Sequence, residues 1–343
     1  MKALVLKDYM RFSYENVPEP DCNDDDALVR VKATGICGSD VHGMDGSTGR
    51  RQPPIIMGHE AAGIIAEVGK NVTEWKKGDR VTFDSTVYLS DDWYSRRGEF
   101  NLSDNREVLG VSCDEYRRDG AFAEYVAVPQ HILYRLPDKM TFEQAAMVEV
   151  LSVAFHAVER TPIFLNDTAV VVGTGIIGLL LIQILRIAGC SSIIAVDIDR
   201  EKLAIAQNLG ADVVLSADSK LLVDEIRSHT HNRGADFAFE AVGIDPTVNM
   251  AVESVRKGGA VTLVGNLAPA VNIPLQEVVT RQLTLVGSCA SSGEYPTCID
   301  MIAQKIINVD ALISATAPLS VGASWFERLY NKEPGLLKVI LIP

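Results

Sequence analysis

One stretch constrains the fold of this chain more than any other: residues 168–197, TAVVVGTGIIGLLLIQILRIAGCSSIIAVD. It begins with an uninterrupted apolar run at 169–172, as expected of a strand buried on both faces. A turn in G-x-G-x-x-G spacing follows, with Gly173, Gly175 and Gly178. A long apolar helix and a second apolar run at 193–196 then lead to Asp197, 19 residues after the last glycine. This order predicts a βαβ unit that binds a dinucleotide; the alternative is the same unit without a ligand.

The expected ligand contacts follow from the chemistry of such a turn. The glycines allow a tight bend, close approach of the backbone to a pyrophosphate and close helix–strand packing, and the pyrophosphate lies at the helix N-terminus. Asp197 is expected to bind the adenosine ribose hydroxyls, and its charge disfavours a 2′-phosphate, so the sequence favours NAD over NADP. The expected cofactor-binding residues are Gly173, Gly175, Ile176, Ile177, Gly178, Asp197, Arg200, Val242, Val264 and Gly265.

The composition limits the class of protein. A length of 343 residues predicts two domains, and 47% apolar residues are enough for full cores. The net charge of −13 argues against nucleic acid or an anionic membrane as a partner. The longest apolar run, 176–185, is too short for a membrane span, and the first residues do not resemble a signal peptide. The six cysteines are scattered, which indicates thiols, so we expect a cytoplasmic protein.

The periodicity changes along the chain. Residues 1 to about 150 are rich in strand signals, except for a helical pattern at 142–160. From residue 167, strands at 213–215, 236–240, 260–264 and 283–286 alternate with helices at about 200–209, 220–228 and 247–256. This predicts a six-stranded doubly wound sheet. The last stretch holds helices near 293–307 and 320–331 and a strand at 337–342. The predicted domains are 1–155 with 288–343, and an inserted dinucleotide domain, 156–287.

A second group of residues has the chemistry of a metal site. Cys37 follows a strand and a glycine turn, His59 and Glu60 follow an apolar approach, and Glu149 lies in an apolar helical run. A thiol, an imidazole and one or two carboxylates suit zinc with an open position, which is the catalytic form of a zinc site. Each residue has another interpretation: Cys37 as a small buried hydrophobe, His59 as a core histidine, and Glu149 as a solvent-facing acid.

The segments G58-H-E-x-x-G63 and C37-G-S-D-x-H42 resemble the zinc-dependent medium-chain alcohol/polyol dehydrogenases, in their sorbitol (L-iditol) and threonine dehydrogenase branch. Glu149 fits the same branch, because the alcohol dehydrogenases proper have cysteine there. The resemblance extends over essentially the whole chain. It implies a GroES-like catalytic domain that carries an inserted Rossmann domain, together with NAD, one catalytic zinc and a homodimer or homotetramer.

The resemblance also implies a role for each site residue. Cys37, His59 and Glu149 are expected to bind zinc, Glu60 to enter the coordination shell transiently, and Asp40 to orient His59. A proton relay is expected to run from Ser39 through the nicotinamide ribose to His42. Phe122 is expected to line the substrate pocket. The residues themselves also allow a helix N-cap for Ser39, a loop histidine for His42 and a core position for Phe122.

Members of this family often carry a second, structural zinc on four cysteines in C-x-x-C-x-x-C-x7-C spacing. At the corresponding positions this chain has Leu89, Asp92, Ser95 and Ser103. Leucine cannot bind zinc and serine hydroxyls are poor ligands, so we expect no structural zinc. The segment that contains these positions, residues 88–104, is called the lobe below. It is then held by packing of Trp93, Tyr94 and Phe100, or is mobile. Another possibility is a carboxylate site for a hard cation, formed by Asp91, Asp92, Glu99 and Asp104.

The leading functional hypothesis is zinc- and NAD-dependent oxidation of a secondary alcohol, most simply a polyol. The alternatives are a threonine or polyol-phosphate dehydrogenase of the same family, a zinc-free reductase, and a non-catalytic dinucleotide-binding protein. An amino acid or a sugar phosphate needs a cation near the pocket. Arg50 and Arg51 could serve, although we expect them on a solvated loop. The choice of polyol follows from the family and not from the residues.

Overall fold

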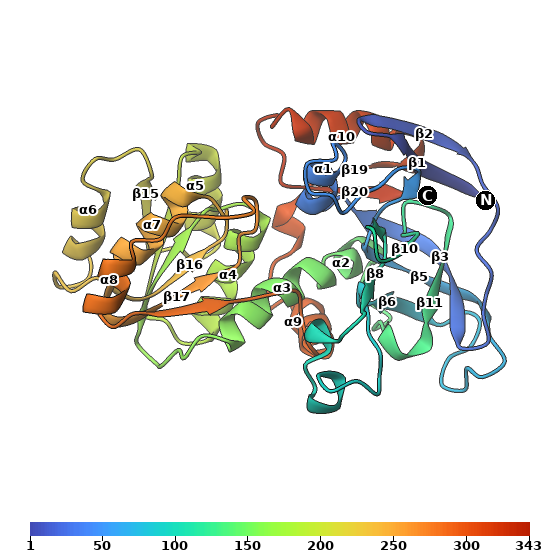
Figure 1. Ribbon diagram of the computed structural model, residues 1–343, viewed down its shortest axis with the longest axis horizontal. Coiled ribbons are helices and arrows are strands. Elements are labelled where there is room, and N and C mark those ends of the chain that lie inside the picture. The colour runs from blue at the N-terminus through green and yellow to red at the C-terminus, as the bar shows by residue number, and fades with distance from the viewer. The chain divides into compact units, whose positions relative to one another are not determined.

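The computed structural model describes all 343 residues, and the chain forms two compact units (Figure 1). The first unit comprises residues 1–150 and 292–343, and the second comprises residues 151–291. The sequence placed the corresponding limits at 155 and 287. The chain therefore leaves the first unit once, completes the second, and returns, which is the expected inserted arrangement.

The second unit is built on a parallel sheet of six strands in the order β15-β14-β13-β16-β17-β18. The strands are β13 Thr168–Val172, β14 Ser192–Asp197, β15 Val213–Ser216, β16 Ala235–Glu240, β17 Val255–Leu263 and β18 Thr284–Gly287. The first strand, β13, pairs with β14 on one side and with β16 on the other. The strand order therefore reverses next to β13, and ligands of doubly wound sheets bind at the carboxyl end of such a switch point.

Besides most of α3 Val148–Glu159, this unit contains five helices. They are α4 Ile176–Ile187, α5 Arg200–Asn208, α6 Leu222–Ser228, α7 Asp245–Ser254 and α8 Leu275–Thr280. The sequence predicted the first four within a few residues of these bounds and did not predict α8. That helix has no buried residue, so it lacks the apolar stripe on which a helix prediction depends.

The first unit is built on a seven-stranded sheet in the order β12-β6-β5-β3-β20-β19, with β11 also paired to β3. The strands are β3 Asp26–Gly35, β5 Glu60–Val68, β6 Arg80–Phe83, β11 Tyr125–Pro129, β12 Leu133–Arg135, β19 Ile313–Pro318 and β20 Lys338–Ile342. Smaller sheets contain β1 Lys2–Asp8, β2 Arg11–Asn16 and β4 Ile55–Ile56, then β7 Thr86–Val87 with β8 Glu107–Val108, and β9 Val111–Ser112 with β10 Arg117–Arg118. Strand β20 pairs antiparallel with β3, so the end of the chain lies beside the strand that leads to Cys37.

The helices around this sheet are α1 Gly38–Gly43, α2 Phe142–Ala146, α9 Tyr295–Ala303 and α10 Gly322–Tyr330, with α3 Val148–Glu159 leading out of the unit. Five short 3-10 turns complete the chain: Ser95–Arg97, Phe100–Leu102, Gln130–Ile132, Asp310–Leu312 and Leu319–Val321. The single helix expected at 142–160 is divided at Met147. A capping box between Thr141 and Gln144 begins α2. No helix in the structure has both the length and the hydropathy of a membrane span.

Candidate metal and dinucleotide sites

Cys37 lies at the junction between β3 and α1. The strand ends at Gly35, the N–H of Ile36 bonds to the carbonyl of Val339 in β20 (3.0 Å), and Cys37 then occupies the N-cap of α1. Its side chain makes no capping bond, so the thiol remains available to other groups. Three hydrogen-bonded elements therefore fix the position of a single sulfur atom.

Glu60 begins the neighbouring strand, β5, which pairs with β3, and His59 directly precedes that strand. Gly58, which precedes His59, has a φ of +98°, a backbone conformation that residues with a side chain rarely adopt. This glycine allows the turn that leads into His59. Gly35 pairs directly with Glu60, and a Cβ at Gly35 would lie 2.3 Å from Glu60 Oε2. A glycine is therefore required at this position for the carboxylate to lie beside Cys37.

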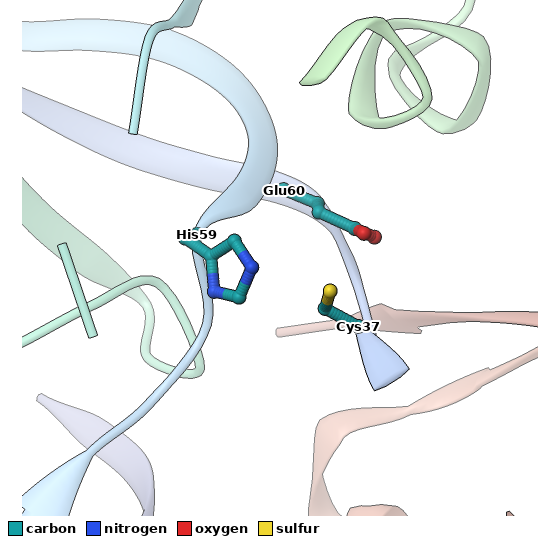
Figure 2. A group of neighbouring side chains, drawn as sticks. All are labelled: Cys37, His59 and Glu60. Atoms are coloured by element: carbon teal, nitrogen blue, oxygen red, sulfur yellow. The ribbon is translucent and has the colours of Figure 1, made fainter. Parts of the chain in front are cut away.

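These three residues form a group of possible metal ligands (Figure 2). Cys37 Sγ, a ring nitrogen of His59 and a carboxylate oxygen of Glu60 all lie within 4.8 Å of one another. His59 is 5% exposed and Glu60 is fully buried, whereas Cys37 is partly exposed. Sequence reasoning predicted Cys37 and His59 together, and the structure places both in one group.

Glu149 does not join this group, although the sequence predicts it as the third ligand and Glu60 only as a transient one. It is the second residue of α3, and its Oε1 accepts a hydrogen bond from Ser85 Oγ (3.3 Å). Its pKa still responds to the charges of His59, Glu60 and Cys37, so the carboxyl lies within their electrostatic reach. In this structure the compact set is therefore Cys37, His59 and Glu60, with Glu149 outside the closest group.

The electrostatics of the group favour a cation. Burial raises the pKa of the Cys37 thiol to about 12, and the charge of Glu60 adds to the shift. Burial also raises the pKa of Glu149 to about 8. A divalent cation reverses this situation, because a coordinating thiol is deprotonated outright. Zinc also prefers these donor types, namely a thiol, an imidazole and carboxylates, so the residues fit a zinc ion.

Lys338 is a member of the site that sequence reasoning missed. It is 1% exposed, and its Nζ donates to Glu60 Oε1 (2.7 Å), to Glu60 Oε2 (2.5 Å) and to the carbonyl of Ile36 (3.1 Å). Burial alone would lower the pKa of Lys338, but the charges of Glu60 and Cys37 outweigh it and the pKa is raised. A lysine inside the apolar run 337–342 was the signal in the sequence.

Asp40 lies behind His59, as the resemblance implied. It is fully buried, and its Oδ1 is 3.6 Å from His59 Nδ1. Arg51 bonds to the same oxygen through Nη2 (2.8 Å) and Nε (3.2 Å) and is only 3% exposed. The expectation of a solvated loop is therefore wrong for Arg51, because its charge has a buried partner, whereas Arg50 is exposed.

Ser39 and His42 lie three residues apart on α1, and both are exposed, while Asp40 and Val41 between them are buried. Residues at this spacing share one face of a helix. Ser39 Oγ lies 3.3 Å from Cys37 Sγ and 3.5 Å from His59 Nε2. Cys37, and not Ser39, occupies the N-cap of α1, so the capping role considered for Ser39 does not apply.

Phe122 requires a correction. Its side chain is fully buried in a core cluster and makes an edge-to-face contact with Phe326, at 5.5 Å between ring centroids. A Cβ on Gly58 would meet its ring at 2.9 Å, so Phe122 packs behind the turn that presents His59. It therefore supports the site from the core and does not line a pocket.

In the second unit, the three glycines of the G-x-G-x-x-G turn have different surroundings. Gly173 has φ +94°, and a Cβ there would meet Val242 Cγ2 at 2.5 Å. Gly175 is the N-cap of α4, and a Cβ there would meet nothing within 4 Å. A Cβ on Gly178 would lie 1.9 Å from the carbonyl oxygen of Gly173. The N-terminus of α4, formed by Ile176 and Ile177, has no side-chain cap, so its N–H groups remain available for a pyrophosphate.

Asp197 ends β14 and is held in place by hydrogen bonds. Its Oδ2 accepts from Thr174 N (2.6 Å) and Thr174 Oγ1 (2.9 Å), and its Oδ1 accepts from Asp199 N (2.9 Å). The carboxylate is thereby tied to the glycine turn, and Oδ1, which accepts only one bond, keeps capacity for a further donor. Arg200 begins α5 and is exposed.

Glu240, at the carboxyl end of β16, is a second residue that the sequence analysis missed. Its Oε1 accepts from the N–H groups of Val242 (2.9 Å) and Gly243 (2.8 Å). Its carbonyl oxygen accepts from Val264 and Gly265 (both 2.9 Å). The carboxylate of Glu240 therefore holds the loop that carries Val242, and its backbone carbonyl holds Val264 and Gly265.

The lobe that lacks the four cysteines is held together by hydrogen bonds. Asp92 accepts from the N–H of Ser95 (2.7 Å) and from the hydroxyl of Ser103, and Ser103 Oγ accepts from the N–H of Leu89 (3.1 Å). The four positions are thus bonded to one another. Tyr88 stacks on Phe100 at 4.4 Å, and Trp93 meets Tyr94 edge-on at 5.0 Å. No acidic metal group forms from Asp91, Asp92, Glu99 and Asp104.

Comparisons with known proteins identify the family of the chain. Residues 23–138 match the family model of the alcohol dehydrogenase GroES-like domain. Residues 177–304 match the model of the zinc-binding dehydrogenase family. The first match contains Cys37, His59 and Glu60, and the second contains Gly178, Asp197 and Glu240.

Two curated relatives extend over almost the whole chain. Sorbitol dehydrogenase of Bacillus subtilis (strain 168) is 31% identical over 350 residues, covering 100% of this chain and 97% of its own. D-arabitol-phosphate dehydrogenase of Enterococcus avium is 32% identical, covering 94% of this chain and 91% of its own. Among solved structures, a putative zinc-binding dehydrogenase from Sinorhizobium meliloti 1021 bound to NADP has a TM-score of 0.91 at 30% identity, covering 100% and 99% of the two chains.

Proposed function

Because this chain belongs to the zinc-dependent medium-chain alcohol/polyol dehydrogenase family, we propose that it oxidises a secondary alcohol of a polyol of the sorbitol or L-iditol type, with NAD as the acceptor. The observation that carries the proposal is the group of Cys37, His59 and Glu60, whose ligand atoms lie within 4.8 Å. A non-catalytic dinucleotide-binding protein has no need of such a group in the same chain as a glycine fingerprint.

We assign the zinc ligands to Cys37, His59 and Glu149. Both oxygens of Glu60 are already bonded to Lys338, so its charge is balanced by a cation of the chain itself. Glu149 is therefore the carboxylate that we expect to stay on zinc, and Glu60 can exchange between Lys338 and the metal. When bound, zinc and the oxidised nicotinamide supply a Lewis acid that acidifies the substrate hydroxyl and an acceptor for the hydride.

The protein groups then have the following tasks. Asp40 fixes the ring of His59 by facing Nδ1, which leaves Nε2 for the ligand position. Ser39 receives the proton from the substrate hydroxyl, and His42 releases it to solvent from the same face of α1. Imidazole is the side chain best suited to exchange protons near neutral pH.

The substrate class is supported by the relatives. The Bacillus relative is named for sorbitol, whereas the Enterococcus relative is named for a polyol phosphate. Polyol-phosphate oxidation is therefore the second candidate. The two differ by a dianionic group, so a phosphorylated substrate requires a cation at the pocket, and a free polyol does not.

The test is a substrate panel of polyols, polyol phosphates and threonine, with NAD reduction and bound metal measured together. We expect NAD reduction by a free polyol in protein that holds zinc. Cys37→Ser is expected to lose zinc and turnover while it still binds NAD, because the second unit is untouched. Full activity in zinc-free Cys37→Ser protein would refute the assignment, and no turnover with any alcohol would favour a non-catalytic role.

The preference for NAD rests on Asp197. In the proposed complex its carboxylate faces the adenosine ribose, and it repels a 2′-phosphate. Asp197→Ala is therefore expected to lower the preference for NAD over NADP, measured as the ratio of their kcat/KM values, by about tenfold or more. Hydrogen bonds to a charged group contribute about 1.5–3 kcal/mol, and about 1.4 kcal/mol is tenfold. The same ratio is measured for the unaltered protein, and equal use of NADP by that protein contradicts the assignment.

A further inference from the structure

We propose that Arg51 is a positioning residue for zinc binding: it holds Asp40 in the orientation that fixes His59. This inference rests on the proposed zinc site and adds a residue to it. Arg51 is outside the group of possible metal ligands. It acts through the carboxylate of Asp40 and, more distantly, through the hydroxyl of Ser39.

The contacts of Arg51 use its whole guanidinium group. Nε and Nη2 both donate to Asp40 Oδ1, at 3.2 and 2.8 Å, and Nη2 also lies 3.5 Å from Ser39 Oγ. Nη1 donates to the carbonyl of Arg50 at 2.9 Å. The side chains of Arg51 and Asp40 are 4% and 0% exposed, so solvent does not weaken the pair. A planar fork can satisfy these acceptors together, whereas a lysine ammonium, as a point charge, cannot.

The pair determines where the charge of Asp40 is directed. Oδ1 lies 3.6 Å from His59 Nδ1, and neither Asp40 Oδ2 nor His59 Nδ1 has a hydrogen-bond partner in the structure. Nε2 of the same ring lies on the other side, 3.5 Å from Ser39 Oγ. Arg51 therefore holds the carboxylate at the nitrogen that must carry the proton when the other nitrogen binds a metal.

The position of Arg51 is itself prepared by the fold. A Cβ on Gly43 would lie 2.5 Å from Arg51 Cγ, so the glycine makes room for the arginine stem beneath α1. Ser112 fixes the backbone on both sides: its N–H donates to the carbonyl of Arg50 (3.3 Å), and its Oγ accepts from the N–H of Gln52 (2.8 Å). The arginine thus enters the site from a segment that cannot easily turn away.

A purely structural ion pair would make a different prediction. It would affect the melting temperature and leave the affinity for zinc of the folded protein unchanged. A positioning role changes zinc affinity itself, because the ring of His59 then has to be ordered when the metal binds. Outer partners of metal ligands typically contribute about 10–100-fold in affinity.

The experiment measures the zinc affinity of folded protein by competition with a chromogenic chelator. Arg51→Gln is expected to weaken zinc binding by about 10–100-fold. Arg51→Lys keeps the charge but loses the planar guanidinium group. Its zinc affinity is expected to lie between those of Arg51→Gln and the unaltered protein. Arg50→Gln is the matched control, because Arg50 is exposed and its side chain makes no contact with Asp40. The zinc affinity of this variant is expected to stay unchanged.

Two further variants show the route of the effect. In the Asp40→Asn background, Arg51→Gln is expected to cause no additional loss, because the residue through which it acts is already altered. Gly43→Ala displaces the stem while keeping the charge, and it is expected to weaken zinc binding even if Arg51→Gln does not fold. Unchanged zinc affinity in the Arg51 and Gly43 variants, or a loss that adds fully to that of Asp40→Asn, overturns the proposal.

The result for Arg51 can be distinguished from the result for the proposed enzymatic activity. A protein that binds zinc but oxidises no alcohol refutes the proposed activity and leaves the test of Arg51 intact. A protein that binds no zinc refutes both. Dinucleotide binding, measured on the same samples, is expected to be the same in all variants, because none of the substitutions lies in the second unit.

Discussion

At the scale of single residues, Lys338 and Arg51 are the two cations that balance the acids around Cys37. Lys338 neutralises Glu60, and Arg51 neutralises Asp40. Removing one member of a buried ion pair commonly costs about 3–5 kcal/mol, because the other charge is left buried and unpaired. The acid-rich site can therefore persist before any metal binds.

Neither cation could be paired with its acid from the sequence, and for Lys338 the reason is the distance along the chain. Lys338 and Glu60 are 278 residues apart, so no local spacing connects them. Cys37, His59 and Asp40 could be found because they occur in short motifs with fixed spacing. Arg51 is adjacent to an exposed arginine in a polar segment, and nothing in that segment distinguishes a buried guanidinium from a solvated one.

Asp84 leads to a prediction about pH. Burial raises its pKa to about 7, although a hydrogen bond from Thr86 opposes the shift, and Glu294 adds a smaller increase. Unfolded, its pKa is about 3.9, so between these values the folded protein holds a proton that the unfolded chain has released. This contribution makes stability fall as pH rises from about 4 to about 7.

Asp84→Asn removes that contribution and is expected to melt higher than the unaltered protein at pH 8, with the difference disappearing near pH 4. The difference in free energy of unfolding between the two proteins is at most roughly 4 kcal/mol, because the pKa shift is about three units at about 1.36 kcal/mol each. Thermal unfolding across this pH range checks it. Asp218→Asn, at an exposed acid, serves as the control and is expected to show no such trend. A constant difference at all pH values would exclude titration as the cause.

At the scale of elements, the turn between β13 and α4 was predictable because its requirements are local. Gly178 packs against the carbonyl of Gly173, five residues earlier, and the spacing of the glycines records that contact directly. Strand β2 and helix α8 were not predicted. Strand β2 has no fully buried residue, and α8 has none either, so neither presents a clean apolar pattern.

Two alanine substitutions separate packing from ligand binding in this turn. Gly178→Ala places a Cβ 1.9 Å from a carbonyl oxygen, and overpacking of this kind costs about 1–3 kcal/mol, so we expect a lower melting temperature without ligand. Gly175→Ala meets no atom and is expected to cost less than about 1 kcal/mol, while it weakens NAD binding. Melting curves with and without NAD check both. Gly178→Ala melting like the unaltered protein would mean that the turn relaxes freely.

At the scale of the whole molecule, the missing cysteines lead to a prediction about metal content. We expect one zinc per chain, and we expect a chelator to remove it without loosening residues 88–104, because Asp92, Ser95, Ser103 and Leu89 are bonded to one another. Metal analysis gives the stoichiometry. Trypsin cleavage at the exposed Arg96 and Arg97 reports the state of the lobe.

Asp92→Ala is expected to speed that cleavage, because Asp92 is the acceptor shared by Ser95 and Ser103. Asp91→Ala changes an exposed neighbour and is expected to leave the rate unaltered. A second zinc per chain, or faster cleavage after chelation alone, would contradict the proposed metal-free lobe.

The insertion of one unit into the other also has a consequence for synthesis on the ribosome. The dinucleotide unit is complete at residue 291, whereas the sheet that carries Cys37 needs β20 and its lysine. In a nascent chain, the sheet of the first unit is therefore unfinished and the charge of Glu60 has no partner, while the second unit is already able to fold. In a cell, the interval before β20 emerges is when this protein most depends on protection from aggregation.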